Sequence, residues 1–175
     1  SPDVYTVNRI LRSGHKCANP PYAMRLAQKG ELVTHHKDKA VLSLLTTENV
    51  IETDMLPIAP EAMLGDLVKM MSTCNRNVFP VIDKDNNYVG EIRVEEVRNI
   101  MFRPELYQRF NMQKLMVAPR ERVDVNDSME LVMKKFERSN AWNLPVLDGT
   151  KYVGYVSKSK IFSAYRSVLV EFSDE

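Results

Sequence analysis

One stretch of this chain occurs twice, and the repeat limits the folds that the chain can adopt. The first copy reads NVFPVID at residues 77–83 with YVG at 88–90, and the second reads NLPVLD at 143–148 with YVG at 152–154. The prolines of the two copies stand 65 positions apart, and the offset falls to 64 after the aspartate because the second turn is one residue shorter. Spacing kept in this way through several elements is hard to obtain by chance, so we interpret it as an internal duplication of one supersecondary unit.

The residues that precede each copy share a second pattern, in which apolar side chains recur at positions i, i+3, i+4 and i+7. They are Leu64, Leu67, Val68 and Met71 in the first copy and Met129, Val132, Met133 and Phe136 in the second. This spacing predicts one apolar face of an amphipathic helix ahead of each repeated stretch. Asp127 and Glu130 have the spacing of a capping box, which predicts that Asp127 caps the second of these helices.

Two strands and a closing helix are expected to follow in each copy. The apolar runs at 78–82 and 144–147 predict buried strands, and the proline in each predicts a strand start or a sheet edge. After a polar turn, second strands are expected at 88–93 and 152–157. The closing helices would bury Val97, Ile100 and Met101 in the first copy and Ile161, Ala164, Tyr165 and Val168 in the second. One such unit is too small to fold alone, so the two copies should pack on each other.

This order of elements, repeated in tandem, resembles a pair of CBS domains, also called a Bateman module. The phrases that carry the resemblance are FPVID…YVGEI and LPVLDG…YVGYVS, and it covers residues 49–170. It implies an α+β fold, a tandem CBS domain pair in which two β-α-β-β-α repeats pack about a pseudo-two-fold axis.

Three further stretches look like the cytoplasmic C-terminal region of bacterial ClC chloride channels and transporters. They are YTVNRILRSGH at 5–15, WNLPV at 142–146 and YVSKSK at 155–160. The resemblance implies a regulatory domain at the cytoplasmic face of the inner membrane, soluble by itself and joined to a transmembrane chloride-conducting domain of the same polypeptide. It also implies a homodimer that modulates the gating of a voltage-gated channel or the transport of a chloride/proton exchanger.

These resemblances predict a division of the chain into five parts. They are a lead-in from the membrane domain at 1–47, CBS domain 1 at 48–103, a linker at 104–111, CBS domain 2 at 112–170 and a tail at 171–175.

Composition and motifs exclude several classes of protein. The chain has 24 Lys and Arg against 23 Asp and Glu, so it lacks the basic field of a nucleic-acid binder. Its apolar runs are shorter than the roughly 20 residues that span a bilayer. The sequence contains no glycine-rich phosphate loop, nucleophile elbow or metal-binding histidine pair, and His35 and His36 are adjacent rather than one helical turn apart. We therefore expect no enzyme activity, no catalytic residue, no metal site and no obligatory cofactor.

An adenine nucleotide is the ligand that the CBS resemblance implies. The family's sites use a Thr or Ser after the second strand's glycine and an Asp three residues later, whose carboxylate accepts from the ribose diol. In the first copy Arg93 and Glu96 stand at these positions, and in the second Ser157 and Lys160 do. A lysine only donates, so it cannot accept from a diol, although it can meet a phosphate. Ser157, Glu96 and the backbone near Thr53 are the candidate site.

Trp142 is expected to anchor the packing between the copies rather than a ligand. Three alternatives to the ClC reading stay open. The first is an adenine-nucleotide-sensing CBS module on another transporter or enzyme. The second is a structural assembly domain that forms a constitutive dimer. The third is a free-standing enzyme, which would need a catalytic group that the sequence does not show.

Overall fold

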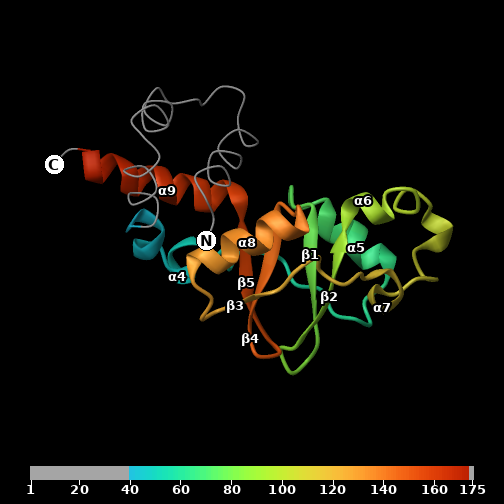
Figure 1. Ribbon diagram of the computed structural model, residues 1–175. Coiled ribbons are helices and arrows are strands. Elements are labelled where there is room, and N and C mark those ends of the chain that lie inside the picture. Colours follow the sequence, from blue (N-terminus) through green and yellow to red (C-terminus); the bar gives the residue numbers. More distant parts are fainter. Residues whose placement is uncertain (1–39, 174–175) are drawn as a thin grey trace.

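The computed structural model describes residues 40–173, and Figure 1 shows their path. The predictions made for residues 5–15, for the two adjacent histidines and for the end of the tail lie outside these residues. The described chain begins with a short helix at 40–44 and then forms α4 (Thr47–Val50). None of the described helices is both long enough and apolar enough to cross a membrane.

Each copy forms a helix, a β-hairpin and a closing helix, as the duplication predicts. The first copy comprises α5 (Leu64–Met71), β1 (Val78–Ile82), β2 (Tyr88–Arg93) and α6 (Val94–Val97). The second comprises β3 (Val123–Asp124), α8 (Met129–Ser139), β4 (Asn143–Asp148), β5 (Lys151–Ser157) and α9 (Lys158–Ser173). Between them lie the 3-10 helix η1 (Pro104–Leu106) and α7 (Met112–Leu115). The predicted apolar faces of α5 and α8 are confirmed, because these faces pack into the two main cores.

Two small sheets form the framework of the copies. Strand β1 pairs antiparallel with β2, and β4 lies between the parallel strand β3 and the antiparallel strand β5. Pro145 therefore lies inside a central strand, and its prediction as a strand start or edge was wrong. The parallel pairing with β3 begins only at Val146, so the missing N–H of Pro145 breaks no bond to that neighbour.

Two local predictions need correction at helix ends. Ser128 caps α8 by accepting from Leu131 N at 3.2 Å, whereas Asp127 pairs with Lys135 at 2.6 Å. The closing helix of the first copy is also shorter than predicted. Helix α6 ends at Val97, and Ile100 lies in a turn in which its N–H bonds to Val97 O at 3.0 Å.

The segments that lead into each copy pack on the other copy. Glu52 pairs with Tyr155 of β5, and Val117 pairs with Glu91 of β2 in the same antiparallel manner. The apolar side chains of the first leading segment that enter the core of the second copy are Val41, Leu42, Leu45 and Val50. A Cβ added at Gly154 would lie 2.5 Å from Glu52 O, so this close approach of backbones requires glycine.

A pseudo-two-fold axis relates the copies, as predicted. Asn87 of one hairpin forms an antiparallel β-bridge with Lys151 of the other, and the two turns meet at the bottom of Figure 1. Tyr88 N donates to Thr150 O at 3.0 Å, and Tyr152 N donates to Asn86 O at the same distance. Each copy thus gives the other an equivalent backbone bond across the axis.

Candidate functional site

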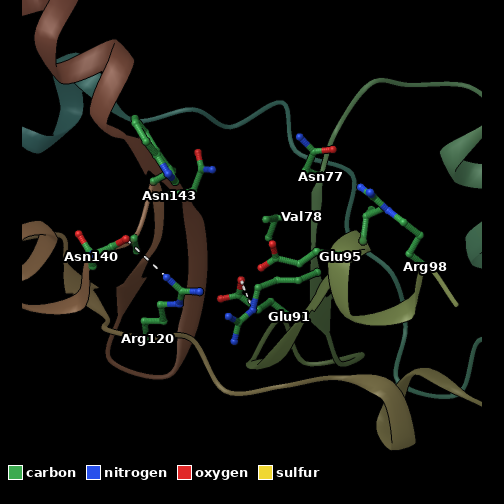
Figure 2. A pocket seen from close by; sticks show the side chains of 12 residues that line it. Asn77, Val78, Glu91, Glu95, Arg98, Arg120, Asn140 and Asn143 are labelled. Carbon is green, nitrogen blue, oxygen red and sulfur yellow. Dashed lines mark hydrogen bonds and ion pairs between the residues drawn. The ribbon is translucent and has the colours of Figure 1, made fainter. Parts of the chain in front are cut away.

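A cleft of about 450 Å³ lies between the two copies, on the side of β2 and α6. Figure 2 shows side chains reaching it from both copies, with Asn77, Val78, Glu95 and Arg98 on one side and Arg120, Asn140 and Asn143 on the other. Its volume falls within the range of about 300–1,000 Å³ that is usual for small-molecule sites. Its lining is mostly polar and includes three arginines and two glutamates.

The three guanidinium groups of the cleft are Arg93, Arg98 and Arg120. The side chain of Arg93 is only 16% exposed, and its Nη2 donates to Ala118 O at 3.2 Å. Its Nε is buried without a hydrogen-bond acceptor in the described part of the chain. Arg120 Nη1 contacts Asn140 O at 3.5 Å, at the limit of a hydrogen bond. The Nε of Arg93 is too buried to meet a ligand, but the other N–H groups of the three arginines can donate to an anion in the cleft.

Glu91 lies at the inner end of the cleft and is 5% exposed. Its Oε1 accepts from Tyr88 OH at 3.2 Å, and its Oε2 lies 3.8 Å from Arg93 Nε. Burial raises the pKa of the Glu91 carboxyl, and the Arg93 charge opposes that rise. Tyr88 OH also bonds to Tyr155 OH at 3.1 Å, so the hydroxyl that contacts Glu91 also contacts the second copy.

Trp142 lies at the mouth of the cleft, and its prediction as a packing anchor between the copies was wrong. It is 55% exposed, with Lys158 Nζ 5.0 Å from its ring centre. The reason is local: Asn140 adopts a left-handed backbone with φ of 57° at the end of α8, after which Ala141 is buried and Trp142 faces outward. An accessible aromatic face thus borders a site lined with arginine.

The pseudo-two-fold axis relates this cleft to a second region, which lies around Arg76 and Lys160. Arg76 lies there between two carboxylates, 3.2 Å from Glu52 Oε2 and 2.6 Å from Asp54 Oδ2. Lys160 Nζ donates to Ile51 O at 3.2 Å. Both cations of the second region are therefore already paired with acceptors of the chain itself.

The three residues predicted from sequence are not brought together at one site. Ser157 is 8% exposed and accepts from Lys160 N at 3.1 Å, so it caps α9 beside the second region. Thr53 lies next to the same region and is exposed. Glu96 belongs to α6 beside the open cleft, but its neighbour Glu95 lines that cleft instead.

Sequence reasoning missed Arg120 and the turn at 140–143 as parts of a site. Applying the 65-residue offset shows why, because Arg120 corresponds to the buried Met55 in the first copy and so has no polar counterpart. No local sequence pattern marks these residues, because the exchange of leading segments, which places the residues around 117–120 beside β2, is visible only in the fold. In the described residues, no group of three or more His, Cys, Asp or Glu side chains is arranged to hold a metal ion.

The CBS domain family matches this chain at residues 47–103 and again at 113–167. The chain belongs to the CBS domain family. One relative is the inosine-5'-monophosphate dehydrogenase of Methanocaldococcus jannaschii, which is 25% identical over 134 residues covering 72% of this chain. The match covers 26% of the dehydrogenase, so this CBS pair spans about a quarter of that relative's length.

Solved structures share the arrangement of the pair. The structure of CbpB in complex with c-di-AMP matches with a TM-score of 0.67 at 17% identity, covering 79% of this chain and 96% of that one. The CBS domain of the bacterial CNNM/CorC family Mg²⁺ transporter in complex with ATP matches with a TM-score of 0.64 at 16% identity, covering 74% and 93%. These likenesses confirm the predicted α+β tandem CBS fold.

Proposed function

We propose that this CBS pair is a regulatory module that senses an adenine nucleotide in the open cleft and acts on a host protein rather than catalysing a reaction. The observation that carries the proposal is the cleft of about 450 Å³ between the copies, with Arg93, Arg98 and Arg120 around it. Guanidinium groups bind phosphate well, because two parallel N–H donors match two phosphate oxygens.

The rest of the cleft suits the remainder of a nucleotide. The exposed ring of Trp142 offers a face on which an adenine base can stack. Asn77, Asn140 and Asn143 supply amide donors and acceptors for the edge of the base. Glu95 supplies a carboxylate that can accept from a ribose diol, which is the role that the sequence assigned to Glu96.

The solved relatives support this ligand class. One is a complex with c-di-AMP and another a complex with ATP, and both proteins share the tandem CBS fold with this chain. The match to part of a dehydrogenase supports an enzyme as one possible host of such a module.

Calorimetric titration of the full chain with ATP, ADP, AMP and c-di-AMP tests the proposal. We expect one site per chain with micromolar affinity, about −8 kcal/mol, for at least one of these nucleotides. Arg120→Ala should weaken binding about tenfold, which corresponds to about 1.4 kcal/mol. Arg109→Ala is the matched control, because Arg109 is exposed and lies outside the cleft lining. Absence of heat for all four nucleotides would overturn the proposal.

A ClC-type chloride channel or exchanger is the second candidate host. The resemblance of residues 5–15, 142–146 and 155–160 to that family favours it. The packing of the leading segment is consistent with coupling, because Val41 and Leu42 are buried in the core of the second copy. A displacement of the segment that precedes Val41 would therefore be transmitted to the core of the second copy. Membrane-spanning segments encoded directly upstream in the gene would support this host, whereas another type of domain there would contradict it.

We also propose that the module forms a homodimer. A host protein that is itself a two-fold dimer would bring two such modules together across its axis. Sedimentation equilibrium of the full chain should give twice the chain mass. A mass of one chain at high micromolar concentration would contradict the dimer without affecting the nucleotide proposal.

A further inference from the structure

The structure describes side-chain burial for residues 40–171. Among these residues, Glu91 is the only buried acidic side chain. It also lines the open cleft, so a ligand bound there would lie beside it. The charged or titratable groups around it come from four elements. They are Tyr88 and Arg93 on β2, Glu95 at the start of α6, Arg120 on the segment before β3 and Tyr155 on β5.

The negative charge of Glu91 is incompletely compensated. Arg93 Nε lies 3.8 Å away, beyond hydrogen-bond distance, and remains without an acceptor in the described part of the chain. The Tyr88 hydroxyl donates one hydrogen bond at 3.2 Å. Burial therefore raises the pKa of this carboxyl above its usual range. Glu91 and any anion in the cleft would share the same cation, Arg93.

We propose that a phosphate-bearing ligand enters this cleft together with a proton, which Glu91 accepts. This inference rests on the proposed function and concerns the same site. A phosphate that pairs with the guanidinium of Arg93 competes with Glu91 for that cation and adds a negative charge beside the carboxyl. Both changes favour the neutral carboxylic acid.

The proton comes from solvent and is held on a Glu91 carboxylate oxygen, and no other bond is made or broken. The neutral acid gains an O–H donor, which can point to a phosphate oxygen where the carboxylate would repel it. Tyr88 joins Glu91 to Tyr155 of the second copy, so the same proton changes the hydrogen bonding at the domain interface. Ligand binding is thereby linked to pH and to the contact between the copies.

Titration of the full chain with ATP and with c-di-AMP at pH 7, in two buffers of different ionisation enthalpy, counts the protons taken up. The phosphodiesters of c-di-AMP do not titrate near neutral pH, so the count for that probe belongs to the protein. We expect net proton uptake in the wild type and a smaller uptake in Glu91→Gln, whose amide imitates the neutral acid. Glu105→Gln is the control, because Glu105 is an exposed carboxylate outside the cleft lining, and its proton uptake should match that of the wild type.

The dissociation constant of the wild type gives a second test that needs no variant. It should rise with pH by up to tenfold per unit above the pKa of Glu91 in the free protein. Equal proton uptake in the wild type and Glu91→Gln, or a dissociation constant for c-di-AMP that is constant from pH 6 to 8, would overturn the inference while leaving nucleotide binding intact. Absence of binding heat at every pH would instead overturn the proposed function, and this inference with it.

Discussion

At the scale of single residues, the burial of Glu91 makes the stability of the protein depend on pH. The folded state raises the pKa of this carboxyl, so between the ordinary value and the raised one the folded chain binds more protons than the unfolded chain. The contribution of Glu91 to the free energy of unfolding is therefore largest at low pH. It is lost as pH rises through this window and stays lower above it.

Glu91→Gln, which imitates the neutral acid, should remove that contribution to the pH dependence and be more stable than the wild type at pH 8. Urea unfolding of both proteins between pH 5 and pH 8 measures the effect. Glu95→Gln is the control, and it should keep the wild-type slope because Glu95 is exposed. A Glu91→Gln protein that is less stable than the wild type at pH 8 would show that the Arg93 ion pair outweighs the burial of the charge.

At the scale of secondary structure, Ser157 acts as a helix cap. Its Oγ accepts from Lys160 N in the first turn of α9, as Ser128 Oγ accepts from Leu131 N in α8. Ser157→Ala should lower the free energy of unfolding by about 1 kcal/mol and leave nucleotide affinity unchanged. Ser128→Ala, which removes the cap of the other long helix, is the matched control with a similar loss. A clear loss of affinity in Ser157→Ala alone would assign this serine to the ligand site.

The close contact between β5 and the first leading segment predicts that a larger residue at position 154 destabilises the fold. Gly154→Ala would place a Cβ 2.5 Å from Glu52 O, and we expect it to cost about 1–3 kcal/mol, the usual cost of overpacking. Gly90→Ala, its counterpart on β2, should cost less, because its nearest neighbour at 3.0 Å is the flexible Met116 side chain. Thermal or urea unfolding of the two variants ranks them, and the reverse order would show that the leading segment yields more easily than Met116.

The regular elements of this fold could be predicted from sequence because their patterns are local. The strands at 78–82 and 88–93 have the predicted bounds, since an apolar run and a polar turn determine them. The exchange of leading segments was not predictable in this way, because the pairing of Glu52 with Tyr155 joins residues far apart in the chain. The candidate site depends on that exchange, which is why Arg120 was missed.

At the scale of the whole molecule, the duplication creates two related regions between the copies, and their sequences have diverged. In one, Arg76 is paired with two carboxylates, whereas in the other Arg93 and Arg120 line an open cleft. The divergence also affects the interface. The Tyr88 hydroxyl donates to Glu91. The hydroxyl of its counterpart Tyr152 has no hydrogen-bond partner in the described residues, because Tyr155 occupies the position equivalent to Glu91. The module should therefore bind one nucleotide per chain rather than two.

The central claim is that the open cleft, rather than the region around Ser157, holds the nucleotide. Amide hydrogen exchange of the full chain, with and without saturating ATP or c-di-AMP, tests it most directly. We predict slower exchange at residues 91–98, 118–120 and 140–143, which border the open cleft. Slower exchange confined to 51–54 and 157–160 would place the ligand in the other region and contradict the account.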